Sequence, residues 1–130
     1  MERAIDPKKS DAAAYAKAVQ ASVSEIAKLL QEVLTRGLTA YAVGVKDAKT
    51  VTRWANGEVT EIRDPEVEKR LRGTYQIVDL LLKVDGAATV RGWFLGMNPE
   101  LDDEAPIDAI RDGRLQDALG AARAYVVLAW

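Results

Sequence analysis

Hydrophobic residues recur at every third or fourth position along most of the chain, which is the spacing of helices that bury one face. After a polar arm over residues 1–9 and a cap at Ser10 or Asp11, the first such stripe comprises Tyr15, Val19, Val23, Ile26, Leu30 and Val33. Ser22 followed three residues later by Glu25 has the spacing of a capping box, so the stripe belongs either to one helix or to two. We expect it to pack on the core.

The first half of this segment, residues 12–21, is rich in alanine and has a second interpretation. Alanine side chains let two helices approach closely, although each buries little area. This half is therefore also a candidate dimer face, and we expect the protein to be a homodimer.

Residues 34–57 predict two short helices that meet at a tight turn. Leu38, Ala42 and Val43 give the first helix its apolar positions, and Gly44 suits a left-handed turn residue because it lacks a Cβ atom. Val45 is expected to plug the turn, and Asp47 to cap a second helix over residues 48–55 that ends at Asn56-Gly57.

The second half of the chain predicts four more helical segments and no strand. Asp64-Pro65 begins a helix that we expect to continue to Val84, because aspartate suits the cap and proline the first helical position. Short helices follow over residues 87–95 and from Pro106 to a stop at Gly113, and a last helix runs from Arg114 to about Val127. The predicted fold class is all-α.

Composition narrows the possible functions. With 130 residues, of which 48% are hydrophobic, the chain has the size of one globular domain. It contains neither cysteine nor histidine, which excludes disulfides, thiolate or imidazole zinc sites, and nucleophile systems that need a histidine base. We therefore expect no catalytic site, no metal and no cofactor.

The charge pattern points to a local basic patch rather than to a polycation. The formal net charge is −2, and the basic residues cluster in the middle third of the chain. No apolar run is long enough to span a bilayer, and the amino terminus does not have the pattern of a secretory signal, so we expect a cytoplasmic protein.

The predicted turn and second helix of residues 34–57 have the layout of a DNA-reading helix-turn-helix. Val51, Trp54 and Ala55 are spaced to face inward. The outward positions and the turn supply the candidate DNA-binding residues, which are Lys46, Lys49, Thr50, Thr52, Arg53 and Asn56. Arg53 can read guanine with two hydrogen bonds, and the lysines can neutralise phosphates. The plainer alternative is an ordinary solvated helix face.

The carboxy-terminal third combines an acidic stretch with an apolar end. Asp102, Asp103 and Glu104 are consecutive, unlike the alternating ligands of a calcium loop, so we interpret them as a solvated loop. The chain ends in Tyr125, Val126, Val127, Leu128, Ala129 and Trp130. Termini are usually polar, so this one either packs on its own core or is buried in a partner.

The segment VRGWFLGMNPELDDEAPIDAIRDG, residues 90–113, resembles the antitoxins of the Xre/MbcA/ParS type, whose partners are RES-type toxins that consume NAD. The matching residues are Trp93, Phe94, Asn98, Pro99, Leu101, Pro106, Ile107, Ile110 and Gly113. The upstream helix-turn-helix is similar to the central region of that family, so the likeness covers roughly residues 23–127. Asp102-Asp103 departs from the family pattern, in which small residues often follow the leucine.

We expect three segments. The first is an arm and helix with possible dimerisation (1–22), and the resemblance implies that a DNA-binding helix-turn-helix unit (23–84) and a small helical toxin-binding domain (85–130) follow. It implies that Tyr125, Val126, Val127, Leu128 and Trp130 bind the toxin, and that the complex binds operator DNA and represses its own operon. A stand-alone or phage-associated regulator of the same fold is the alternative. A protein-interaction module without DNA binding is a third possibility, because the charge is nearly neutral.

Overall fold

The structure is a computed structural model, and it describes residues 6–129. The helices are α1 (Pro7–Gln20), α2 (Val23–Val33), α3 (Arg36–Val43), α4 (Ala48–Ala55), α5 (Pro65–Leu81), α6 (Ala87–Leu95), α7 (Pro106–Arg111) and α8 (Leu115–Ala129), with a short 3₁₀ turn η1 (Pro99–Leu101) before α7. No β-strand occurs between residues 6 and 129, and the all-α prediction is confirmed over that range.

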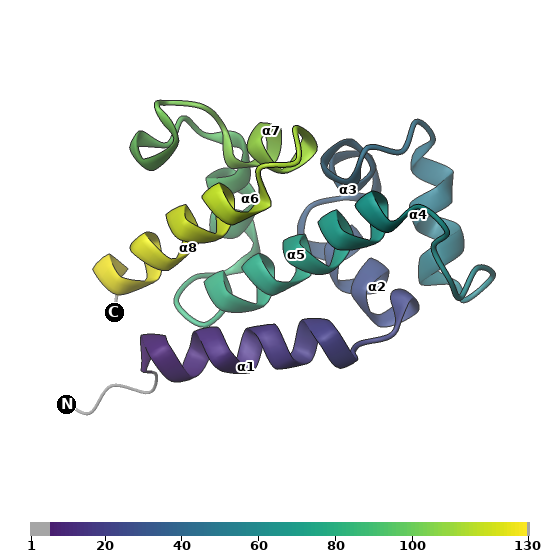
Figure 1. The fold of residues 1–130 in the computed structure, drawn as a ribbon, viewed down its shortest axis with the longest axis horizontal. Helices are drawn as coiled ribbons and strands as arrows, with labels where there is room; N and C mark the ends of the chain where they lie inside the picture. Colours follow the sequence, from purple (N-terminus) through teal and green to yellow (C-terminus); the bar gives the residue numbers. More distant parts are fainter. Residues whose placement is uncertain (1–5, 130) are drawn as a thin grey trace.

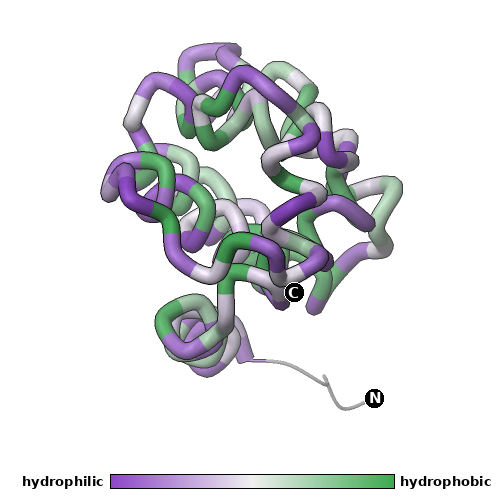
Figure 2. Tube along the Cα trace, turned by 90° about the vertical axis from the view of Figure 1, so that its right-hand side faces the viewer, coloured by the Kyte–Doolittle hydropathy of each residue, from purple (hydrophilic) through white to green (hydrophobic). Residues whose placement is uncertain are grey.

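Helix α5 crosses the middle of the molecule (Figure 1). Helix α1 lies along one side of it, α6, α7 and α8 lie on the opposite side, and α2, α3 and α4 surround its amino-terminal half. Hydrophobic and hydrophilic segments alternate along the helices, as expected of helices that bury one face (Figure 2). The buried side chains form one cluster that includes residues of every helix.

The α5–α8 contact depends on a glycine. A Cβ atom on Gly73 would lie 2.8 Å from Cγ of Leu115 and closer still to both of its methyl groups. The absence of a side chain at residue 73 therefore lets α8 approach α5 at this point. Every residue from Gly73 to Leu81 is buried, so α5 is covered on all sides over this stretch.

Helix α1 begins earlier than predicted, so the prediction of a cap at Ser10 or Asp11 is wrong. The cap is Asp6, whose Oδ1 accepts a hydrogen bond from the Lys8 backbone N–H at 3.0 Å, and Pro7 is the first helical residue. This is the same Asp-Pro signal that begins α5, where Asp64 caps at 2.9 Å as predicted. Ser10 is instead buried on the inner face of α1.

The apolar stripe belongs to two helices. The Ser22 side chain accepts from the Glu25 N–H at 3.1 Å and starts α2, where Val23, Ile26, Leu30 and Val33 are buried as predicted. In α1, however, the buried residues are Ala14 and Ala18, while Tyr15 and Val19 are exposed. The prediction that these two residues pack on the core is wrong, because α1 turns its small side chains toward α5.

Polar tethers hold α1 in place. Lys17 Nζ donates to Asp79 Oδ1 of α5 at 2.9 Å, and Arg72 Nη1 donates to the carbonyls of Ala18 (2.9 Å) and Ala21 (2.7 Å). The hydrogen bond and charge of Asp79 raise the pKa of Lys17 above its ordinary value. Asp79 is itself buried, so its carboxylate depends on this partner.

The remaining boundaries differ little from prediction. Helix α5 ends at Leu81 rather than Val84, α6 occupies residues 87–95, and α8 continues to Ala129. No helix in the described range has both the length and the apolar composition needed to cross a membrane.

Gly73→Ala tests the close α5–α8 contact. Alanine has the better helix propensity by about 1 kcal/mol, but overpacking against Leu115 costs about 1–3 kcal/mol, so we expect a lower unfolding free energy in urea. The control is Gly120→Ala, where a Cβ meets nothing within 4 Å and α8 should gain about 0.5–1 kcal/mol. If Gly73→Ala raised the unfolding free energy as much as Gly120→Ala does, the close contact between α5 and α8 would be contradicted.

Lys17→Met tests the tether to Asp79. The raised pKa means that charged Lys17 stabilises the fold at neutral pH and that this contribution is lost as the pH rises through the folded-state pKa. We therefore expect Lys17→Met to lower the melting temperature at neutral pH, and the difference from wild type to shrink above pH 10.5, the ordinary lysine value. A difference that does not change with pH would argue against the ion pair.

Candidate nucleic-acid interface

The turn between α3 and α4 has the features that the sequence predicts. Gly44 adopts φ +86°, and its N–H donates to the Ala40 carbonyl at 3.0 Å. Val45 is half-buried against the core. Asp47 Oδ1 accepts from the Lys49 N–H at 2.9 Å and caps α4, so its carboxylate is already engaged at the start of that helix.

The inner face of α4 is anchored on α2. Val51, Trp54 and Ala55 are buried, as predicted. Ser24 Oγ of α2 donates to the Ala55 carbonyl at 2.9 Å, which fixes the end of α4. The predicted end at Asn56 is confirmed, and the Gly57 N–H closes it on the Trp54 carbonyl at 3.1 Å.

The outer face of α4 carries Lys49, Arg53 and Asn56, all exposed, and Lys46 is exposed in the turn before it. Thr50 and Thr52 are only half-exposed, which corrects the prediction that they face fully outward. Thr52 Oγ1 donates to Gln31 Oε1 of α2 at 3.1 Å, so this hydroxyl supports the α2–α4 contact.

The cations of this region differ from the other described arginines in their bonding. Arg70 and Arg91 donate to the carbonyls of Ile110 and Val33, and Arg111 donates to that of Tyr41. Arg72, Arg114 and Arg123 form ion pairs. Within residues 6–129, the arginines without such a bond are Arg36, Arg53 and Arg63, which lie at the start of α3, on α4 and just before α5.

The two lysines of the site, like Arg53, form no ion pair within residues 6–129. Neither Lys46 nor Lys49 has an ion-pair partner in the described part of the chain. These elements lie at one end of the molecule, on the right of Figure 1. The same end also carries exposed carboxylates, those of Glu25, Glu32, Glu58 and Glu61.

Two arginines of α5 have structural roles. Arg72 pairs with Glu68 at 2.9 Å, and it also holds α1. Arg70 Nε donates to the Ile110 carbonyl at 3.2 Å, and its two terminal nitrogens lie 3.6 and 3.7 Å from where Cβ atoms on Gly44 and Gly113 would be. Sequence reasoning did not foresee that Arg70 joins the turn after α3 to the turn after α7.

The predicted toxin-binding residues are divided between core and surface. Val126 is buried, and the Tyr125 hydroxyl donates to Asp85 while its ring meets the edge of Trp93. That hydrogen bond raises the pKa of Tyr125 above its ordinary value. Val127 and Leu128 are exposed by 61% and 87%. Trp130 lies outside the described residues.

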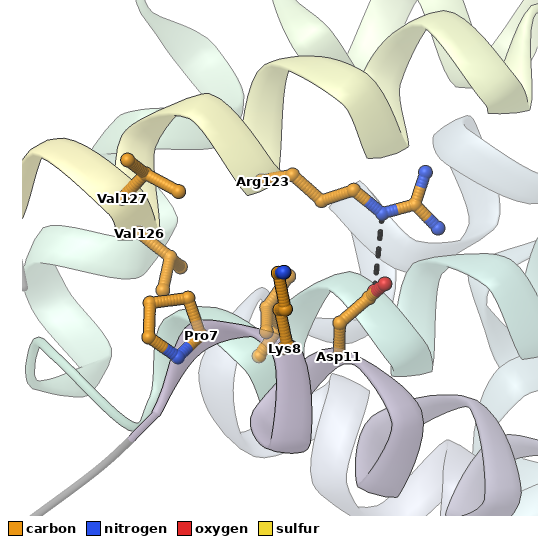
Figure 3. A pocket seen from close by; sticks show the side chains of 7 residues that line it. Pro7, Lys8, Asp11, Arg123, Val126 and Val127 are labelled. Carbon is orange, nitrogen blue, oxygen red and sulfur yellow. Dashed lines mark hydrogen bonds and ion pairs between the residues drawn. The ribbon is translucent and has the colours of Figure 1, made fainter.

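A small pocket beside this end is lined by Pro7, Lys8 and Asp11 of α1, Leu80 of α5, and Arg123, Val126 and Val127 of α8 (Figure 3). Arg123 Nε donates to Asp11 Oδ1 at 3.1 Å across its edge. The pocket has a volume of about 170 Å³, enough for one side chain rather than for a cofactor.

Comparison with models of known protein families, with curated proteins and with solved structures found no match.

Trp54→Ala should lower the free energy of unfolding by about 3–5 kcal/mol, because Trp54 is 3% exposed and anchors α4 on the core. The measurement is urea unfolding followed by circular dichroism. An equally stable variant would show that α4 does not depend on its inner face for its position.

Proposed function

We propose that the protein binds double-stranded DNA through α4, which enters the major groove, with α3 packed across it as the supporting helix of a helix-turn-helix. The single observation that carries the proposal is the exposed face of α4. This face presents Lys49 and Arg53, without ion-pair partners in residues 6–129, on a helix whose opposite face is buried. Such a helix has outward donors and a fixed orientation, the two properties that groove reading requires.

The proposed roles follow from side-chain chemistry. Arg53 donates two hydrogen bonds to a guanine edge, and Asn56 can pair with an adenine edge or with the backbone. Lys46 and Lys49 neutralise phosphates, and the Thr50 hydroxyl donates a hydrogen bond to a base edge or to a phosphate. Thr52 contributes indirectly, because its hydroxyl is bonded to Gln31. Since the lysines neutralise phosphates in this arrangement, we expect the affinity for DNA to fall as the salt concentration rises.

Lys49→Ala combined with Arg53→Ala tests this proposal. We expect weaker binding to the DNA upstream of the gene, by about 1–3 kcal/mol for the lost guanine contact. The slope of log K against log salt should also flatten by about 0.9 for the lost phosphate contact. Fluorescence anisotropy titrations at several salt concentrations measure both.

The matched control is Lys8→Ala combined with Lys9→Ala, which removes two exposed lysines from the start of α1, at the opposite end of the molecule. The control should bind as wild type does. If both double variants lose affinity equally, binding depends on total charge and not on α4. If neither loses affinity, α4 is not the DNA-contacting helix.

An antitoxin role is the second candidate, and the exposed apolar end of α8 favours it. The residues that carry the family resemblance are mainly core residues here: Phe94, Leu101, Pro106, Ile107 and Ile110 are buried. They can account for the fold but not for recognition of a partner. Val127 and Leu128, in the same half of the chain, are exposed, and exposed apolar side chains that lie together are typical of a protein contact.

Affinity purification of the tagged protein from its native host, followed by mass spectrometry, separates the two candidates. Recovery of a stoichiometric RES-like toxin supports the antitoxin role. Recovery of the protein alone or with DNA supports a stand-alone regulator.

If a toxin is recovered, Val127→Asp combined with Leu128→Asp should abolish its co-purification and leave DNA affinity unchanged, because both side chains are exposed and lie on α8, away from α4. Equal recovery of the toxin with this variant would place the contact elsewhere.

A further inference from the structure

Helix α1 packs on the rest of the molecule through very small side chains. Its buried residues are Ser10, Ala14 and Ala18, whereas the shorter helix α2 buries four branched aliphatic side chains. The two alanines belong to the stretch that the sequence offers as a dimer face, but they pack on α5 instead. Because an alanine buries a single methyl group, this contact gains little from the removal of apolar surface from water.

Charged side chains hold α1 at three points along its length. Asp11, near the start, accepts a hydrogen bond from Arg123 of α8 at 3.1 Å (Figure 3). Lys17, in the second half, pairs with Asp79 of α5 at 2.9 Å, and Arg72 of α5 binds carbonyls at the end of α1. Both ion pairs include a partly exposed side chain, so dissolved salt screens them.

The docking of α1 leaves Asp79 incompletely paired. Its side chain is only 8% exposed, and its Oδ1 accepts from Lys17. Its Oδ2 is buried and forms no hydrogen bond with any residue of the described range. A buried carboxylate oxygen without a partner has lost hydration, and this cost offsets part of the attraction between the two charges. The Lys17–Asp79 pair therefore stabilises the docked helix less than its short distance suggests.

The joint between α1 and α2 allows α1 to move by itself. Ala21 and Ser22 both have extended backbone angles, with ψ of 144° and 156°. The Ser22 side chain accepts from the Glu25 N–H and caps α2, so the start of α2 does not need α1. A change of backbone angles at these two residues would move α1 and leave α2 in place.

We propose that α1 is a strap that opens from α5 and α8 as one unit, pivoting at Ala21 and Ser22, while α2 to α8 stay folded. The charged contacts keep the strap closed, so the ionic strength sets the fraction of open molecules. Segments with few buried apolar contacts are the ones that open below the global unfolding free energy. Opening brings Asp79 and Leu80, which are buried in the closed form, to the surface of α5. The proposal does not depend on DNA binding.

Native-state hydrogen exchange, followed by NMR at neutral pH, tests the strap. The amides of α1 should exchange with one common opening free energy, below that of the amides of α2 and α5. The ratio of the α1 rate to the α5 rate should rise severalfold in ~1 M NaCl, because the screening length there is only about 3 Å. Exchange of α1 as slow as that of α5 overturns the proposal. A steady gradient of rates along α1 also overturns it, since it indicates fraying rather than opening as a unit.

Lys17→Met, with Lys9→Met as its matched control, tests the role of charge. Both substitutions remove one positive charge from α1, but Lys9 is exposed and has no ion pair within residues 6–129. Lys17→Met should speed exchange throughout α1 by about tenfold or more and leave the rates of α2 and α4 unchanged. The control should leave all of these rates as in wild type. Equal effects of the two variants, or none from Lys17→Met, contradict a strap held by its charges.

Thiol labelling gives a second, independent measurement. The chain contains no cysteine, and Ala14 of α1 and Ala27 of α2 are both fully buried. In variants that circular dichroism shows to be folded, Ala14→Cys should react with a thiol reagent far faster than Ala27→Cys, and its rate should rise with salt. Equal rates for the two variants would show that α1 does not open separately from α2.

Discussion

The contact between Gly73 and Leu115 determines how the two halves of the molecule fit together. Helix α8 can approach α5 only because residue 73 has no side chain. From that point to Leu81, α5 is covered on every side, and it becomes the common support of α1, α2, α3 and α8. A helix in this position buries polar side chains as well as apolar ones, and each of them needs a partner. Thr74 donates to the Arg70 carbonyl, and Asp79 accepts from Lys17.

The same arrangement explains why α1 presents apolar side chains to solvent. A helix that packs through alanines gains little from burial, so its position depends on polar tethers. Tyr15 and Val19 stay exposed on the outer face of α1, where they line a groove together with Lys69, which has no ion pair in the described residues. At the opposite end, Arg53 and Lys49 of α4 have no such tether in the described residues.

Local signals predicted much of this fold. Caps and turn residues such as Asp47, Gly44 and Asp64-Pro65 act only on residues close to them in the chain. Signals of this kind correctly predicted the ends of α4 and α6 and the beginning of α7. The error at α1 arose because the apolar stripe continues through the break between α1 and α2. Periodicity alone does not show which side of a helix packs against another helix, so it could not tell that alanines rather than Tyr15 face the core. The local signal for the true start of α1 is Asp6-Pro7, the same pair of residue types that begins α5.

The candidate site was predictable in its composition but not in its bonding. The positions of Lys49 and Arg53 follow from the helix period. Which arginines are engaged elsewhere does not, because the carbonyls that bind Arg70, Arg72 and Arg91 lie 40 or more residues away in the chain. The bond between Thr52 and Gln31 also joins residues of different helices. Only the packed structure separates cations that hold the fold from cations that remain available to a ligand.

The position of Arg70 has a thermodynamic consequence. Its guanidinium touches the turn that precedes α4 and the turn that precedes α8, so a shift of either turn changes the surroundings of the same group. A ligand on α4 that favours one arrangement of its turn would change the affinity of a partner on α8 by some factor. By linkage, the partner must then change the affinity of that ligand by the same factor. A single half-buried guanidinium in contact with both turns would thus be the physical link between a ligand on α4 and a partner on α8.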